Sequence, residues 1–172
     1  MTAATPFEDA PSLPASLDAL LDYDHAALAA LYEHASVPRV ADVAGDLRGR
    51  MLAIPAVTGP AAGVLRRIAG SSAFPWRGKS FTPRSADAGE GRNRVFVDRL
   101  QVFRFTTAVG PSRAGAFDAL QLDYDHAGNP GFIRRIEDEL RELRPGLWLG
   151  QAWFRVRPNK KSMALWFGLE AR

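Results

Sequence analysis

The chain has 172 residues, with 22 Lys and Arg against 19 Asp and Glu, and it contains no cysteine. A chain of this length can form one domain that buries roughly 70% of its unfolded surface, so its core needs no disulfide bonds to be stable. The lack of cysteine excludes thiol catalysis, iron–sulfur clusters and cysteine zinc sites. No window approaches a membrane span and no signal pattern opens the chain, so we expect an unexported protein, cytoplasmic by default, with no membrane among its partners.

The basic residues concentrate in the middle third of the chain. Residues 51–115 hold ten Lys and Arg against three Asp and Glu, whereas residues 1–50 hold three against eight. These arginines are spread singly or in one pair, while a nucleic-acid surface needs a continuous basic stripe interleaved with stacking aromatics. The pattern therefore favours a small anionic ligand, held by one or two arginines, over nucleic acid.

The N-terminal third combines a loose arm with helical and strand patterns. Residues 1–15 are rich in proline and alanine, which predicts a loose arm. Ser16 can cap a helix, because leucines recur at helical spacing over residues 17–35. A first strand over residues 47–54 and a short helix over residues 61–69 follow before the sheet resumes.

The next strand begins with an aromatic residue and a cation close together. Trp76, Gly78, Lys79 and Phe81 form a Trp-x-Gly-Lys-x-Phe segment. In a small barrel, a ring can fill the tapered base and a cation can stack on an aromatic face. The segment resembles that of uncharacterised bacterial members of the lipocalin-like (calycin-like) small barrels, although Phe74 stands where their Gly-x-Trp motif has glycine. The resemblance implies a cavity for a small apolar or amphipathic molecule, with Trp76 and Lys79 at the barrel base.

The middle of the chain predicts strands beside a cavity. Gly89–Asn93 is typical of a flexible turn; residues 94–107 then predict one long or two short strands, and residues 117–125 predict the next. Polar side chains fall on both sides of the first of these strands, as expected for a cavity with a few oriented polar groups. Alternatively, the arginines of this strand extend to the rim of the barrel, and only the aliphatic parts of their side chains pack against it. The candidate ligand-binding residues are Arg99, Phe103, Arg104, Phe105, Trp153 and Trp166.

A polar cluster ends the last of these strands. Asp123 and Asp125 share one strand face, and His126 follows them. Such a cluster can bind a divalent metal or act as an acid/base pair, but it can also be a simple polar strand end. Because a metal site usually needs three or four ligands and the chain holds three histidines, we expect no metal and no cofactor. The candidate catalytic residues are Tyr124, Asp125 and His126, with Arg104 beside them.

The C-terminal residues predict a helix and a hairpin. Asn129–Pro130 can cap a helix over residues 129–144, and its apolar residues form one helical stripe: Ile133, Ile136, Leu140 and Leu143. Strands over residues 147–156 and 163–169 follow, and their short connection makes them antiparallel. Neither strand has a polar face, which predicts a sheet curled around an interior with helices outside. A flat α+β sheet with helices on one face is the alternative.

Together these patterns predict an α+β protein with one domain over residues 16–172. Its antiparallel sheet closes into a lipocalin-like β-barrel, with N-terminal helices and one helix before the last hairpin. The predicted function is binding of a small hydrophobic or amphipathic molecule, anionic ones included, in the barrel cavity. One alternative is a small barrel enzyme with acid/base chemistry, of the isomerase, cyclase or dehydratase type. Another is a protein- or nucleic-acid-interaction module. The sequence leaves open whether the protein forms a homodimer.

Overall fold

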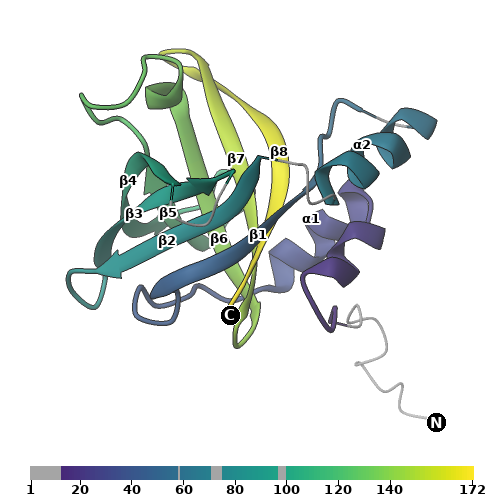
Figure 1. Cartoon of the computed structure of the whole chain (residues 1–172), viewed down its shortest axis with the longest axis horizontal. Helices are drawn as coiled ribbons and strands as arrows, with labels where there is room; N and C mark the ends of the chain where they lie inside the picture. Colours follow the sequence, from purple (N-terminus) through teal and green to yellow (C-terminus); the bar gives the residue numbers. More distant parts are fainter. Residues whose placement is uncertain (1–12, 58, 71–74, 97–99) are drawn as a thin grey trace, which may run out of the picture.

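A closed antiparallel barrel forms the body of the protein (Figure 1). The computed structural model describes residues 13–57, 59–70, 75–96 and 100–172. Each strand pairs with the next, and the last pairs with the first, which confirms the expected barrel. The strands are β1 Gly45–Ala53, β2 Trp76–Pro83, β3 Ala88–Val95, β4 Leu100–Pro111, β5 Asp118–Asp123, β6 Ile136–Arg144, β7 Leu147–Arg157 and β8 Lys160–Glu170.

Four short helical segments accompany the strands. They are η1 Asp18–Asp22, α1 His25–His34, α2 Pro60–Gly70 and η2 Ile133–Arg135. The helix expected over residues 17–35 is divided into η1 and α1, because Tyr23 and Asp24 between them are extended. The Asp24 side chain caps α1 by accepting a hydrogen bond from the backbone N–H of Ala27 at 2.9 Å. No helix among the described residues combines the length and apolarity that a bilayer crossing needs.

Apolar side chains pack in two layers, one inside the barrel and one between the barrel and the N-terminal helices. Trp148 and Phe167 belong to the inner layer. Their sequence neighbours Leu149 and Trp166 belong to the outer layer, with leucines of η1 and α1. Figure 1 shows these helices on one side of the barrel. The two layers explain why neither strand of the last hairpin has a polar face.

The segment that precedes β1 closes one end of the barrel. Val40 and Val43 are buried there in the inner layer, which also contains Leu47, Phe81 and Phe105. Because consecutive strands run antiparallel, the β1–β2, β3–β4, β5–β6 and β7–β8 connections all lie at the opposite end, which we call the open end.

The helix expected over residues 129–144 is wrong, because most of it is strand β6. Its apolar residues fit a helical stripe, yet the structure divides them between the two layers, with Leu140 inside and Leu143 outside. Pairing with β5 and β7 closes the barrel and outweighs a weak local helix preference. Asn129 caps no helix here, because its side-chain amide donates to the carbonyls of Arg104 and Tyr124.

The turn expected at Gly89–Asn93 is also wrong, since these residues lie within β3. Gly91 pairs with Phe81 on one side and with Phe105 on the other. A Cβ at this position would collide with the Ser80 carbonyl and the Phe105 ring, so close packing requires the glycine here. Of the residues expected to form one long or two short strands, 94–95 belong to β3 and 100–107 to β4.

Replacing Gly91 with alanine should destabilise the barrel. The added methyl group has to displace a backbone carbonyl and a buried ring, and overpacking of this kind costs about 1–3 kcal/mol. Gly128→Ala is the matched control, because no atom lies within 4 Å of the Cβ it would add. Chemical denaturation should show a lower free energy of unfolding for Gly91→Ala alone, and equal stabilities of the two variants would contradict the packing argument.

Candidate functional site

A cavity of about 290 Å³ occupies the open half of the barrel. Its wall includes the end of β1 at Met51 and the start of β2 at Trp76, which places its mouth at the open end. The lining is mostly apolar and comprises Met51, Pro75, Trp76, Val95, Phe103, Ile133, Ile136, Ala152, Leu165 and Phe167. Four polar residues complete the wall: Lys79, Asn93, Tyr124 and Asp138.

Lys79 is the centre of a buried hydrogen-bond network in this wall. The residue is 3% exposed, and its ammonium nitrogen Nζ has three acceptors. It donates to Asn93 Oδ1 at 2.9 Å, to Tyr124 OH at 2.5 Å and to Asp138 Oδ2 at 2.8 Å. The network joins β2, β3 and β6 with the residue that follows β5, so it connects strands from different sides of the barrel.

Aromatic rings surround the same ammonium group. Lys79 Nζ lies 5.0 Å from the ring centroid of Phe167, 5.2 Å from Tyr124, 5.4 Å from Phe105 and 5.5 Å from Trp76. At these distances each ring face attracts a cation. The Trp76 indole N–H also donates to Asn93 Oδ1 at 3.0 Å, which fixes the side chain that accepts from Lys79.

Burial sets the protonation of the network. It lowers the pKa of Lys79, and the charge of Asp138 opposes that effect. We assign Lys79 as an ammonium group, because all three of its hydrogen-bond partners can accept and the rings favour a cation. Burial and the nearby Asp138 carboxylate raise the pKa of Tyr124 well above its usual value, so Tyr124 stays a neutral phenol. Its hydroxyl donates to Asp138 Oδ2 at 3.0 Å.

One oxygen of the network is left without a hydrogen bond. Asp138 Oδ1 is buried and has no hydrogen-bond partner, whereas Oδ2 of the same carboxylate accepts from both Lys79 and Tyr124. A buried carboxylate oxygen without a donor is costly. Asp138 is one of the cavity-lining residues, so this side of the wall holds an acceptor without a donor, while every donor of Lys79 is already in use.

A β-bulge places another residue in the cavity wall. The pairing of β3 with β4 shifts between Arg92–Arg104 and Asn93–Val102, so Phe103 is the extra residue. Its φ of 57° lies in the left-handed region, which a bulky side chain rarely adopts. Strain of this kind persists only where the surrounding structure fixes it, and here it accompanies a ring that lines the cavity.

The structure brings together some of the residues that the sequence singled out. Trp76, Lys79, Phe103 and Tyr124 line the cavity. Trp76 and Lys79 are in its wall at the open half, rather than at the closed base that the resemblance implied. Phe105 is fully buried beside Lys79, in the inner layer.

Other candidate residues lie away from the cavity. Arg104 is exposed and pairs with Glu90, while Asp125 accepts from Arg134 on the outside of the barrel. The Trp166 indole N–H donates to His25 of α1 at 2.7 Å, so Trp166 belongs to the helix-packing layer. The remaining candidates are Trp153, which donates to Gln151, His126, which is not among the cavity residues, and Arg99, which lies outside the described residues.

Sequence analysis missed Asn93 and Asp138. Asn93 was expected in a turn. Asp138 was expected on the solvent-exposed face of the helix over residues 129–144, outside its apolar stripe. A period of two was nonetheless present, because Ile136, Asp138 and Leu140 alternate with charged residues, and this alternation is the strand signal that could have placed Asp138 inside. Their partners are distant in sequence: Lys79 and Asp138 are 59 residues apart.

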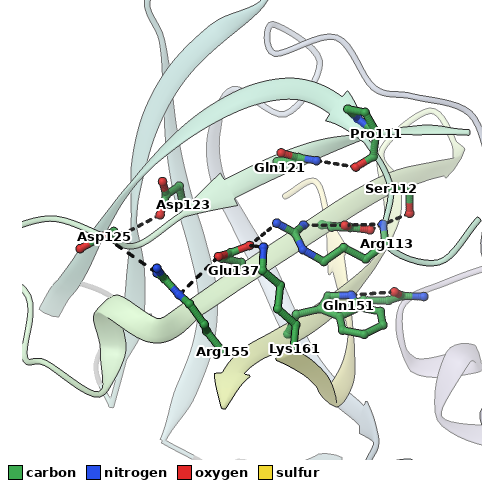
Figure 2. A network of polar contacts seen from close by, with 12 residues as sticks. Pro111, Ser112, Arg113, Gln121, Asp123, Asp125, Glu137, Gln151, Arg155 and Lys161 are labelled. Carbon is green, nitrogen blue, oxygen red and sulfur yellow. Dashed lines mark hydrogen bonds and ion pairs between the residues drawn. The ribbon is translucent and has the colours of Figure 1, made fainter. Parts of the chain in front are cut away.

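A second network lies on the outer side of β6, as Figure 2 shows. Glu139 is fully buried there and accepts from the Ser112 hydroxyl at 2.7 Å and from the Arg113 backbone N–H at 2.8 Å. Glu137 pairs with Arg113 and Lys161. Burial alone would raise the pKa of Glu137, but these cations lower it overall. The network attaches the β4–β5 connection to the barrel wall and contains none of the cavity residues.

Comparison with known proteins supports the barrel and no more. No known family matches the chain, and no curated protein does. A protein from Thermomonospora curvata, known from its crystal structure, is similar in fold, with a TM-score of 0.51 and 18% sequence identity. The match covers 87% of this chain and 88% of that one. At this identity the likeness shows a shared fold, and the site must be interpreted from its own chemistry.

Removing only the cation of the buried Lys79–Asp138 pair should lower the free energy of unfolding more than removing both charges. Lys79→Met leaves the Asp138 carboxylate buried and uncompensated, which costs about 3–5 kcal/mol. The double variant Lys79→Met/Asp138→Leu removes both charges and should recover most of that loss. Denaturant unfolding of both variants and of Asp138→Leu completes the cycle.

A surface pair provides the control for this cycle. Lys161→Met removes a cation from Glu137, which keeps Arg113 as a partner, so the loss should stay below about 1 kcal/mol. Additive effects of Lys79→Met and Asp138→Leu would show that the two charges are not coupled.

Proposed function

We propose that the barrel binds a small, largely apolar molecule in the cavity at its open end. The observation that carries the proposal is an apolar cavity with one polar cluster in its wall, since ligand sites combine apolar lining with a few placed polar groups. The resemblance of Trp76–Phe81 to lipocalin-like barrels, which enclose cavities of this kind, supports the same proposal.

The cavity volume limits the size of the molecule. At about 290 Å³ the cavity lies near the lower end of ligand pockets, which range from about 300 to 1,000 Å³. A cavity of about 150 Å³ binds benzene in another protein. Twice that volume suits a molecule with two fused rings or a chain of similar size.

The polar cluster supports a ligand whose buried end donates a hydrogen bond. Asp138 Oδ1 lacks a donor, so a ligand O–H or N–H would satisfy it. An anionic end is less suited, because the Lys79 donors are all taken and Asp138 would repel it. The acid/base alternative loses its expected pair, since Asp125 and His126 are not cavity residues.

Small naphthalenes test the proposal. We expect 2-naphthol to bind at least about tenfold more tightly than 2-methylnaphthalene, which has the same shape and no donor, because a hydrogen bond to a charged group contributes about 1.5–3 kcal/mol. We expect 2-naphthoate to bind more weakly still. Titration calorimetry gives the affinities, and quenching of the intrinsic tryptophan fluorescence, to which Trp76 contributes, offers a second readout.

A pair of tryptophan substitutions locates the binding site. Ala152→Trp fills the cavity from its wall and should abolish naphthol binding, whereas Ala164→Trp, at an exposed position of β8, should leave it unchanged. The proposal fails if none of the three compounds binds, or if the two variants bind equally well.

A further inference from the structure

Exposed apolar side chains gather at the open end of the barrel. Among the described residues, the large apolar side chains that are exposed at this end include Phe96 (65% exposed) and Phe132 (63%). Leu100 and Val156 are also exposed, at the start of β4 and near the end of β7. We call Phe96, Leu100, Phe132 and Val156 the apolar rim. Because the connections that carry them share one end of the barrel, the rim lies at the end where the cavity opens.

The conformation of Phe96 indicates that its exposure is fixed by the fold. Its φ of 54° lies in the left-handed region, which costs free energy for a bulky residue. Hydrogen bonds hold it there, since the Phe96 N–H donates to the Pro75 carbonyl at 2.5 Å and Arg77 Nε donates to the Phe96 carbonyl at 3.3 Å. A strained backbone thus presents an aromatic ring to solvent beside the cavity.

Arginines lie beside two members of the apolar rim, Val156 and Phe96. A surface groove of about 410 Å³ beside Val156 is lined by Arg134, Arg135, Arg155 and Arg157, with Asp125 as its one acidic residue. Arg134 pairs with Asp125 at 2.7 Å, and the Arg135 guanidinium donates to two backbone carbonyls. The groove therefore keeps a net positive charge next to an exposed apolar side chain.

We propose that the apolar rim and this arginine groove dock on the surface of an anionic phospholipid bilayer. Apolar side chains on three connections, with arginines beside Val156 and Phe96, suit insertion among lipid headgroups, where the arginines meet phosphates. A protein partner would favour one continuous apolar patch, whereas these side chains come from separate connections. Docking goes beyond the proposed ligand binding, because a ligand can enter the cavity without a bilayer. Docking would place the cavity mouth against the lipid.

Vesicle binding tests the docking surface on the full chain without added ligand. We expect the protein to sediment with vesicles of phosphatidylcholine and phosphatidylglycerol, and not with vesicles of phosphatidylcholine alone. Added salt should weaken the binding, because it screens the arginines. Phe96→Ser/Phe132→Ser should lower the partition coefficient about tenfold or more, since two rings no longer leave water. Arg157→Gln should weaken binding to the anionic vesicles.

Val109→Ser is the matched control. Val109 is 40% exposed near the end of β4, at the closed end of the barrel, so this variant should bind vesicles like the unchanged protein. Equal binding to neutral vesicles, no binding to anionic ones, or an equal loss in Val109→Ser would overturn the docking proposal. Circular dichroism should show that the variants, all at exposed positions, are folded.

The two proposals fail separately. Ala152→Trp should lose naphthol binding and keep vesicle binding, whereas Phe96→Ser/Phe132→Ser should do the reverse. Naphthol binding without vesicle binding would refute docking alone. If the rim variants instead impair naphthol binding in the absence of vesicles, the rim is part of the ligand site and does not act as a lipid surface.

Discussion

The buried pair of Lys79 and Asp138 is the constraint on which the interior of this barrel depends. Two charges taken out of water cost several kcal/mol each unless nearby groups satisfy them. The protein therefore supplies acceptors from β3 and from the residue after β5, together with four aromatic rings. These groups must converge for the pair to be tolerated, so the pair fixes how the strands sit around the cavity.

The two apolar layers explain why the cavity opens at one end. Val40 and Val43 fill the closed end from the segment before β1. Outside the barrel, η1 and α1 cover β8 and its neighbours, and the hydrogen bond from Trp166 to His25 attaches α1 to the wall. Residues 17–43 thus cover the base and one side of the barrel, and the cavity lies where the strands meet the connections of the open end.

The sequence predicted the features whose signals are local. The last hairpin followed from its alternating strands and short turn, the strand at Trp76 from its Trp-x-Gly-Lys-x-Phe segment, and the closure of the sheet from apolar residues on both faces of the hairpin strands. Strand β6 did not follow, because Ile133, Ile136 and Leu140 suit a helix as well as a strand, and the charged residues among them look exposed. Asp138 and Glu139 are buried by partners far along the chain, namely Lys79 and Arg113. Such partners are invisible to a local pattern, so the pairing of Lys79 with Asp138 could not be predicted, although the alternation around Asp138 could have placed that residue inside a strand-built wall.

The cavity and the apolar rim are built from the same connections. Pro75 and Trp76 line the cavity, and Pro75 also accepts the hydrogen bond that holds Phe96 in its strained conformation. On the β5–β6 connection, Ile133 lines the cavity while its neighbour Phe132 is exposed. Each exposed ring is therefore within one or a few residues of a residue of the cavity wall, and the two features cannot be built from separate parts of the chain.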